Sequence, residues 1–266
     1  MKDNGLVSVI MPSYNTAKYI AETIRSVMNQ TYPYWELIIV DDCSTDETDE
    51  VVKQFLSDTR IRYLKNEENS GAAVSRNYAL REAKGKWIAF LDSDDVWLPE
   101  KLERQINFML EHGYKFSCTD YRVCQDGEFL PYVCISPKVT TRRKLINYCY
   151  ISTLTVMYDR EFVGLIQVEN IRKRNDYAMW LEVVKKTPCY RLPLYLSYYC
   201  RHNGSLSSGS KLRLVKHQYL LYRKGLHKSK IASAYYTLNN MFFGVLKKVF
   251  YKKRYKESDA SILPVK

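Results

Sequence analysis

The chain has 266 residues, 46% of them hydrophobic, which is enough for one large α/β domain or for a domain plus an appendage. No apolar run approaches the ~18 residues of a membrane span, so no spanning helix is expected. The net charge is +12, and the excess is confined to residues 201–256, which hold fourteen Lys and Arg and no Asp or Glu.

Short apolar runs alternate with helical patterns through the first hundred residues. Strands are expected at 6–11, 35–40, 61–64 and 87–91, because these runs are apolar and rich in β-branched and aromatic residues. Helices are expected at 18–30, from the capping box Ser44 to Glu47 through 55, and at 72–83 with Gly85 as C-cap. This β-α-β-α-β-α-β order predicts an α/β fold with a mostly parallel sheet.

The fourth strand runs directly into three carboxylates, Asp92, Asp94 and Asp95. Three acids within four residues repel one another unless a cation lies among them. Mg²⁺ binds through one or two carboxylates and takes its other ligands from water and substrate phosphates. Polar groups also follow the first two strands, and ligands of open parallel sheets bind outside these strand ends. The pattern therefore predicts a metal–phosphate site; a plain acidic turn is the alternative.

The second half is expected to add elements of both kinds. These are a helix at 99–112, a strand or hairpin at 114–130 turning at Asp126-Gly127, a helix at 139–150, a strand at 152–158, a helix at 175–186 with Asn175 as N-cap, a strand at 190–200, a polar stretch at 204–209, and helices at 211–226 and 228–250.

The chain up to about residue 208 resembles the family-2, GT-A-fold inverting glycosyltransferases of bacterial surface-polysaccharide type, which use nucleotide sugars. The matching motifs lie at 8–15 (Ser-Val-Ile-Met-Pro-Ser-Tyr-Asn), 40–46 (Val-Asp-Asp-Cys-Ser-Thr-Asp), 69–71 (Asn-Ser-Gly), 75–77 (Ser-Arg-Asn) and 90–95 (Phe-Leu-Asp-Ser-Asp-Asp). The resemblance implies a domain at 1–208, with a donor half at about 1–98 and an acceptor half at about 99–208. Residues 209–266 then form a basic helical segment.

The resemblance implies that Pro12 and Tyr14 line the nucleotide base and that Asp42 accepts a hydrogen bond from a uracil N–H. Asp41 is the alternative base reader, or a partner that neutralises Arg76. Arg76 is expected to pair with Asp92 or with the diphosphate. Other residues that the resemblance brings to the nucleotide sugar are Asn69 and Ser93.

The resemblance implies a divalent metal, Mn²⁺ or Mg²⁺, held by Asp94. Asp92 would contact the ribose and the metal shell, whereas Asp95 is expected to cap the helix after Pro99. Two residues of a later polar loop are further candidates, Arg201 for the diphosphate and His202 for the metal. A solvated loop is the alternative for that segment.

The base that deprotonates the acceptor hydroxyl lies, in this family, at an acidic pair that opens a later helix. The matching pair here is Asn175-Asp176, where the family commonly has Glu-Asp. Asp176 is therefore the expected base. Alternatively, Asp176 complements the helix dipole.

The basic segment interleaves cations with aromatic residues from 247 to 256. This pattern predicts that 211–256 binds an anionic membrane surface, with a solvated helix face as the alternative. Nucleic acid is not expected, because no nucleic-acid-binding module accompanies the charge. The odd number of cysteines, seven, and the polar N-terminus predict a cytoplasmic protein peripherally associated with the inner face of the membrane. The composition is compatible with an oligomer.

The expected function is transfer of a sugar from a UDP-sugar to a glycan or lipid-linked oligosaccharide in polysaccharide, O-antigen or capsule assembly. One alternative is another metal-dependent nucleotide enzyme, such as a nucleotidyltransferase. It would need a Gly/Lys-rich triphosphate loop after the first strand, where residues 12–15 read Pro-Ser-Tyr-Asn. The other alternative is a non-catalytic binding module that docks on membranes.

Overall fold

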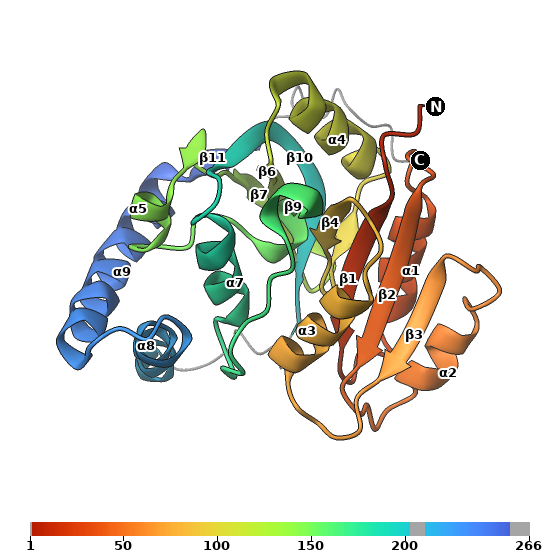
Figure 1. Cartoon of the computed structure of the whole chain (residues 1–266), viewed down its shortest axis with the longest axis horizontal. Helices are drawn as coiled ribbons and strands as arrows, with labels where there is room; N and C mark the ends of the chain where they lie inside the picture. Colours follow the sequence, from red (N-terminus) through yellow and green to blue (C-terminus); the bar gives the residue numbers. More distant parts are fainter. Residues whose placement is uncertain (1, 203–210, 256–266) are drawn as a thin grey trace.

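The computed structural model describes residues 2–202 and 211–255. These residues form one mixed sheet of eleven strands flanked by helices (Figure 1). The first half consists of β1 (Val7–Ser13), α1 (Ile20–Met28), β2 (Trp35–Asp41), α2 (Thr48–Lys53), β3 (Ile61–Lys65), α3 (Ala72–Glu82) and β4 (Trp87–Phe90). The four strands and three helices expected here are confirmed.

β1 is the centre of the parallel part of the sheet. It pairs with β2 on one side and β4 on the other, and β2 pairs with β3, all in parallel. The carboxyl ends of the four strands therefore meet at one edge. This places the segments after Ser13, Asp41 and Phe90 side by side, although they are far apart in the chain.

The strands are buried on both faces, which explains their unbroken apolar runs. Successive residues alternate between two hydrophobic clusters, because side chains of a strand point to opposite faces. Ile10 and Ile38 join the cluster that contains α3 and α7, whereas Val9 and Leu37 join the cluster that contains α1 and α4. The two helical layers thus fix the sheet from both sides.

The second half completes the sheet. It consists of β5 (Val96–Trp97), α4 (Lys101–His112), β6 (Phe116–Gln125), β7 (Glu128–Cys134), β8 (Val139–Thr140), α5 (Arg142–Leu145), η1 (Thr153–Thr155), β9 (Val156–Asp159), α6 (Arg160–Val163), α7 (Asn175–Val183), β10 (Cys189–Arg201), α8 (Lys211–Leu220), η2 (Leu221–Gly225), α9 (Lys230–Phe250) and β11 (Lys252–Arg254). The strand order is β11-β7-β6-β9-β4-β1-β2-β3, and β10 pairs with β5, β6 and β8.

The hairpin expected at 114–130 is confirmed: Asp126 and Gly127, both with positive φ, connect β6 to β7. The helix expected over 139–150 is wrong. Val139 and Thr140 instead pair with β10, and only one helical turn, α5, follows. The strand expected at 152–158 begins later, because residues 153–155 form a 3₁₀ turn before β9.

Three expected helix termini are also wrong. α2 begins at Thr48, and its N-cap residue Glu47 makes no side-chain cap bond, so the Ser44 capping box is absent. The C-cap of α3 is Ala83 and not Gly85. The N-cap of α7 is Arg174, in the left-handed region at φ 68°, and Asn175 is the first helical residue. In each case the residue expected to cap the helix makes a hydrogen bond to another part of the fold, and this bond outweighs its local capping preference.

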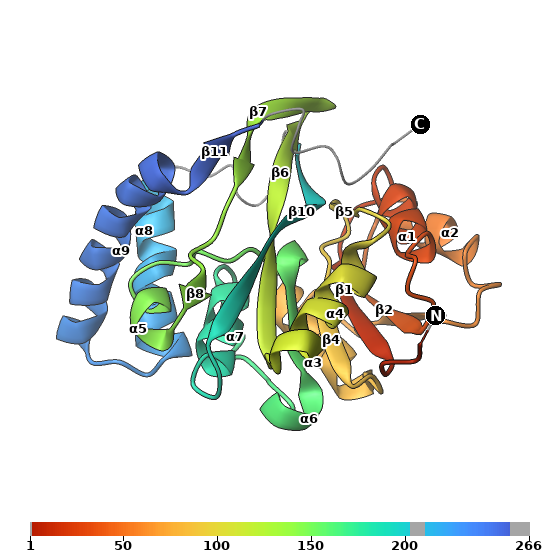
Figure 2. The same ribbon diagram turned by 90° about the horizontal axis from the view of Figure 1, so that it is seen from above.

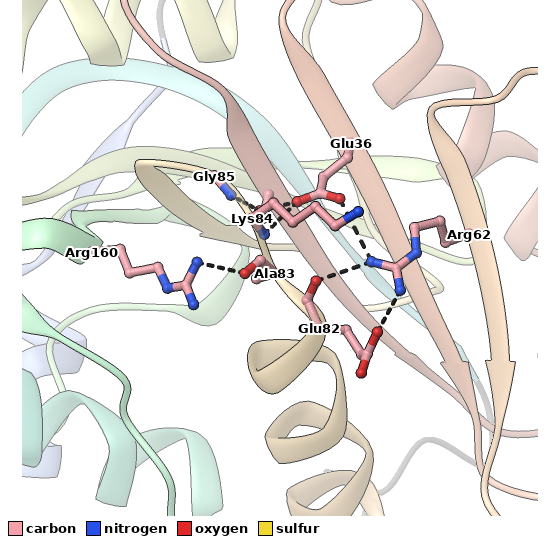
Figure 3. A network of polar contacts seen from close by, with 8 residues as sticks. Glu36, Arg62, Glu82, Ala83, Lys84, Gly85 and Arg160 are labelled. Atoms are coloured by element: carbon pink, nitrogen blue, oxygen red, sulfur yellow. Dashed lines mark hydrogen bonds and ion pairs between the residues drawn. The ribbon is translucent and has the colours of Figure 1, made fainter.

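Gly85 belongs to a polar network at the amino ends of the strands, opposite the carboxyl edge (Figure 3). The Ser8 hydroxyl donates to Glu36 Oε1 at 2.6 Å and accepts from the Gly85 N–H at 2.7 Å. Glu36 Oε1 also accepts from the Lys84 N–H at 2.7 Å, and Arg62 lies 3.8 Å from Glu36 Oε2. The network connects β1, β2 and β3 to the loop that leads into β4.

The C-terminal segment packs α8, η2 and α9 beside α5 and α7, at the end of the molecule farthest from β3 (Figures 1 and 2). β11 then adds an outer strand to β7. None of the helices within the described ranges has both the length and the apolar composition needed to cross a bilayer. The expected polar stretch at 204–209 and the domain boundary at 208 lie outside the described residues.

The substitution Gly85→Ala is expected to lower the free energy of unfolding by about 1–3 kcal/mol, the usual cost of overpacking a rigid site. The added Cβ would lie 2.6 Å from the Ser8 backbone nitrogen and 2.7 Å from the Leu6 carbonyl oxygen. Urea unfolding measures the difference. The control is Lys84→Ala, which keeps the backbone N–H and should change the value by less than about 0.5 kcal/mol. Equal stabilities of the two variants would contradict this packing.

Candidate active site

The carboxyl edge of β1 and β2 carries two loops that hold each other in place. Asn15, at φ 52°, donates its backbone N–H to the Ser44 hydroxyl at 2.9 Å, and its side-chain oxygen accepts from the Thr45 N–H at 2.8 Å. Ser44 in turn donates its hydroxyl and its N–H to the Asp41 carboxylate. Asp41 is therefore the anchor of the β2 loop, and Arg76 is not its partner.

Asp42 is nearly buried and organises the turn at 69–71. Its Oδ1 accepts hydrogen bonds from Asn66 Nδ2 at 2.7 Å and from the Ser70 N–H at 2.9 Å. Its Oδ2 accepts from the Gly71 N–H at 2.7 Å, and Asn69 Nδ2 donates to the Asp42 carbonyl oxygen. A carboxylate has about four acceptor positions, so three of those of Asp42 are already used.

Pro12 and Tyr14 lie at the same edge. Pro12 is in the last part of β1, opposite Val40 of β2, and Tyr14 follows the strand with 48% of its surface exposed. Tyr14 thus presents an aromatic ring to solvent next to the Asp41–Asp42 loop. An exposed ring beside buried acceptors suits a flat heteroaromatic ligand.

The loop after β4 holds the acidic motif. The Ser93 carbonyl oxygen accepts a bond from the Thr23 hydroxyl of α1 at 3.1 Å, which fixes the loop between its two acids. Asp92 and Asp94 are both partly exposed. Burial, and secondly the charge of Asp92, raise the pKa of Asp94 to about 6. Burial and the charge of Asp92 therefore destabilise the ionised form of Asp94. A nearby cation would offset this destabilisation.

Asp95 has a different role from the one expected. α4 begins at Lys101 with Glu100 at its N-cap, so Asp95 does not cap this helix. Asp95 is fully buried instead, and its Oδ1 accepts a bond from the Cys200 N–H at 2.9 Å. Burial, and then the charges of Asp94 and Asp92, raise the pKa of Asp95 well above its ordinary range. This bond ties the acidic loop to the end of β10.

Arg76 joins the two halves of the site. Its guanidinium is buried, forms an ion pair with Asp92 and donates a hydrogen bond to Asn175 Oδ1. Burial lowers the pKa of Arg76, but the charges of Asp92, Asp176 and Asp94 outweigh it and leave the pKa raised. The same cation therefore lies within electrostatic reach of all three carboxylates.

Asp176 lies in the first turn of α7. Its Oδ2 accepts a bond from the Thr153 hydroxyl at 3.3 Å, and its side chain is partly exposed. Asn175 is buried, holds Arg76 through Oδ1 and donates Nδ2 to the Ile171 carbonyl oxygen. Asn175 is thus a neutral partner of Arg76 at the start of α7.

Arg201 and His202 end β10 on this side of the molecule. Arg201 is exposed, with its guanidinium 5.7 Å from the centre of the Tyr199 ring. His202 stacks on Tyr19 with ring centres 3.7 Å apart. Within the described ranges, no three His, Cys, Asp or Glu side chains are grouped so that they could hold a metal. A metal here would need ligands from the substrate besides Asp94 and Asp92, which fits a diphosphate.

Asp92, Asp94 and Asp176 lie around Arg76. The other predicted donor-side residues, Pro12, Tyr14, Asp42 and Asn69, belong to the strand-end loops and the 69–71 turn. Arg201 and His202 contact Tyr199 and Tyr19 instead. The sequence reading missed the supporting residues Asn15, Asn66 and Thr153. Asn15 could have been suspected, because Asn is enriched at positive φ in tight turns. Asn66 and Thr153 carry no local signal, because they reach the site through tertiary packing.

This edge of parallel strands, with an acidic loop facing a second acid on a later helix, is the arrangement of a GT-A glycosyltransferase. The sequence matches the profile described as Glycosyl transferase family 2 over residues 8–163. The chain belongs to this family and is a glycosyltransferase.

Two similar relatives cover most of the chain. A Bacillus subtilis (strain 168) protein, provisionally named a teichuronic acid biosynthesis glycosyltransferase, TuaG, is 46% identical over 82% of this chain and 88% of its own length. The Escherichia coli "UDP-Glc:alpha-D-GlcNAc-diphosphoundecaprenol beta-1,3-glucosyltransferase WfgD" is 38% identical over 93% of this chain and 97% of its own.

Solved structures show the same fold at lower identity. The S. aureus TarS 1-349 complex with UDP-GlcNAc has a TM-score of 0.69 at 23% identity, covering 87% of this chain and 70% of that one. The mannosyltransferase PcManGT from Pyrobaculum calidifontis, in complex with GDP-Man and Mn²⁺, has a TM-score of 0.61 at 17% identity. It covers 96% of this chain and 77% of that one.

The pKa of Asp94 gives a prediction for the metal-free protein. Because folding raises this pKa from 3.8 to about 6, the unfolded chain loses the proton first, and the stability of the folded state falls as pH rises through this window. Asp94→Asn does not titrate there. In EDTA it should be about 2–3 kcal/mol more stable than the wild type above pH 6 and equal to it below pH 4.

Urea unfolding from pH 3.5 to 7.5 measures this gap. Asp126→Asn, at the exposed hairpin turn, is the matched acid-to-amide control. A constant difference between Asp94→Asn and the wild type across this range would contradict the burial of the charge.

Proposed function

We propose that this glycosyltransferase is a metal-dependent, inverting enzyme that moves a sugar from a UDP-sugar to a lipid-linked saccharide in surface-polysaccharide assembly. Residues of about 1–98 supply the donor side, and residues of about 99–208 supply the acceptor side. The observation that carries the proposal is Arg76, which contacts Asp92 of the acidic motif and Asn175 beside Asp176. Arg76 thus brings the acidic motif of the donor side close to Asp176 of the acceptor side.

The donor side is built from the strand-end loops. Tyr14 and Pro12 would line the base, and the Asp41–Asp42 loop, braced through Asn69, would read its edge. Asp42 keeps one acceptor position for a uracil N–H, since its other bonds go to Asn66 and the 70–71 turn. Asp41, with two bonds from Ser44, is the alternative reader.

The diphosphate would lie at the acidic loop. Asp94 would hold a divalent cation, Mn²⁺ or Mg²⁺, with Asp92 at the ribose and the metal shell and Ser93 beside them. When bound, the metal supplies charge that stabilises the departing diphosphate. Arg201 would add a cation to the diphosphate, and His202, stacked on Tyr19, is a candidate further ligand of the metal.

The acceptor side needs a base that faces the anomeric carbon from the side opposite to the diphosphate. Asp176 would take the proton from the acceptor hydroxyl onto a carboxylate oxygen as that hydroxyl attacks. The Thr153 hydroxyl orients Oδ2, and buried Arg76 supplies a fixed positive charge within reach. One displacement with the base and the leaving group on opposite sides inverts the anomeric centre.

The choice of substrates rests on the relatives. The two Escherichia coli relatives at 38% and 37% identity, WfgD and WfaP, are named for transfer from UDP-Glc to a sugar on diphosphoundecaprenol. The TarS complexes contain UDP or UDP-GlcNAc. We therefore place UDP-glucose and UDP-GlcNAc first among donors, and a polyprenyl-diphosphate sugar first among acceptors.

Such an acceptor is embedded in a membrane, and the chain carries its excess positive charge in residues 201–256. We assign residues 211–256 to the anionic surface of the membrane and the enzyme to its cytoplasmic face. All seven cysteines are free, which is compatible with a reducing compartment.

Asp176→Asn is expected to lower kcat by about 10²–10⁴-fold, because general-base catalysis contributes this much. The Kd for UDP-sugar should stay within about twofold, because the substitution leaves the donor contacts in place. Transfer to an acceptor is measured as the release of UDP. Binding of the UDP-sugar is measured by calorimetry. The control is Glu182→Gln, on the same helix α7, which should retain activity. Normal turnover by Asp176→Asn would rule out this base.

A thermal-shift panel of nucleotide sugars tests the donor. UDP-glucose or UDP-GlcNAc with Mn²⁺ should raise the Tm, because a ligand of the folded state stabilises it by mass action. The rise should vanish in EDTA and in Asp94→Asn. Larger shifts with nucleoside triphosphates than with UDP-sugars would favour a nucleotidyltransferase instead.

A further inference from the structure

Helix α9 is packed with its polar side inward. Ser233, Thr237 and Asn240 are buried against the rest of the molecule, and Asn240 Nδ2 donates to the Asn147 carbonyl oxygen at 3.0 Å. Gly244 lies so close to Tyr148 that a Cβ there would be 3.0 Å from the ring. Lys247, on the same side, donates to the Cys149 carbonyl oxygen at 3.2 Å. The inward side of α9 is therefore polar or small along most of its length.

The outward side of α9 is apolar. Six residues recur at alternating intervals of four and three, a spacing that places them on one narrow stripe of a helix. Each is more than half exposed: Ile231 (85%), Tyr235 (59%), Leu238 (67%), Phe242 (61%), Val245 (63%) and Val249 (67%). We call these six residues the outer stripe. A water-soluble surface helix normally buries its apolar stripe and exposes its polar one, so α9 is inverted.

The charge around the outer stripe limits what can cover it. No acidic residue occurs from 201 to 256, and β11, directly after α9, exposes Lys252, Lys253 and Arg254. A second copy of α9 would bring like charges together, which opposes pairing through this stripe. An apolar stripe flanked by cations instead matches an anionic lipid bilayer, where the stripe enters the acyl region and the cations meet the headgroups.

We infer that α9 lies in the plane of an anionic membrane with the outer stripe inserted, and that it is the surface by which the enzyme docks. This inference rests on the proposed function for its acceptor and names the face that meets the lipid. Figures 1 and 2 both place α9 at the outer end of the molecule, where this face is accessible. A helix of 21 residues supplies about 30 Å of contact along the bilayer.

The inward side of α9 is connected by contacts to the acceptor side of the site. Lys247 contacts the segment at 147–149, and the charges of Asp176, Lys247 and Arg174 all act on the Cys149 thiol. Tyr177 of α7 donates to the Leu145 carbonyl oxygen in the same region. A docked α9 would therefore be connected to α7, which carries Asp176, through this segment and η2.

Vesicle co-sedimentation of the full-length chain tests the docking face. Wild type should bind vesicles of phosphatidylcholine with phosphatidylglycerol more tightly than vesicles of phosphatidylcholine alone, and added salt should weaken the binding. The double variant Leu238→Ser/Phe242→Ser should lose about tenfold or more of its partition coefficient, because it removes two apolar side chains from the stripe. The control Phe162→Ser, at a comparably exposed Phe on α6, should bind as the wild type does.

Tryptophan fluorescence gives a second, independent readout. The four native tryptophans are at most 2% exposed, so a tryptophan placed on the surface reports its own surroundings. Phe242→Trp should shift its emission to the blue on anionic vesicles, whereas Phe162→Trp should not. Equal responses of the two reporters would overturn the inference.

Two further outcomes are decisive. Undiminished vesicle binding by Leu238→Ser/Phe242→Ser would overturn the inference. So would a lipid-free dimer that becomes monomeric in this variant, because the stripe would then be a contact between copies. The thermal shift of the double variant with UDP-sugar and Mn²⁺ is recorded in parallel. If the double variant shows the wild-type shift in Tm but no longer binds vesicles, the result supports docking through α9. If neither the wild type nor the double variant shows a shift in Tm with UDP-sugar and Mn²⁺, the proposed function is contradicted instead.

Discussion

The buried guanidinium of Arg76 is the interaction on which the site depends. A fully desolvated cation is costly unless charged partners surround it, and Arg76 has Asp92 as a direct partner with Asp94 and Asp176 within electrostatic range. Its second bond goes to Asn175, at the start of α7. The acidic loop after β4 and the helix that carries Asp176 are therefore positioned by one side chain, although 84 residues separate Asp92 from Asp176 in the sequence.

This arrangement gives Asn175 a defined role at the start of α7. Arg76 needs an acceptor on α7, and the amide oxygen supplies one without a further negative charge. With Asp92, Asp94, Asp95 and Asp176 already present, a further carboxylate would add repulsion to a site that contains one buried cation. Asn175 also donates to the Ile171 carbonyl oxygen, which a carboxylate could not do. Asn175 thus binds Arg76 without adding to the negative charge of the site.

The sequence predicted the parts of the fold that are governed by periodicity. The four parallel strands, α1, α3, α4 and α9 follow apolar patterns that the structure repeats, and the Asp126-Gly127 turn follows from its dipeptide. Local rules failed where tertiary bonds compete. Ser44 accepts a bond from Asn15 and does not cap α2, Gly85 donates its N–H to Ser8, and residues 139–140 pair with β10. Asp95 was assigned to a helix start because nothing in the sequence indicates its bond to Cys200, 105 residues away.

The inverted packing of α9 could not be predicted from the sequence. Its apolar and polar residues show an ordinary helical period, which does not tell which side of the helix faces inward. Which side faces inward is decided by Asn147, Tyr148 and Cys149, whose polar backbone and ring favour the small and polar side of the helix. The sequence shows the positive charge of the segment. That the apolar side of α9 faces outward is seen only in the structure. Together they connect the proposed docking face of α9 to the helix that carries the proposed base.

The most direct test of the central claim is a double-mutant cycle on kcat/KM between Arg76→Lys and Asn175→Ala. Lys retains the charge of residue 76 but cannot bridge Asp92 and Asn175 with a planar fork. If Arg76 couples the two halves, the effects should be non-additive, with a coupling energy of about 0.5–3 kcal/mol. Additive effects would show that the acidic loop and α7 act independently, and would contradict the account.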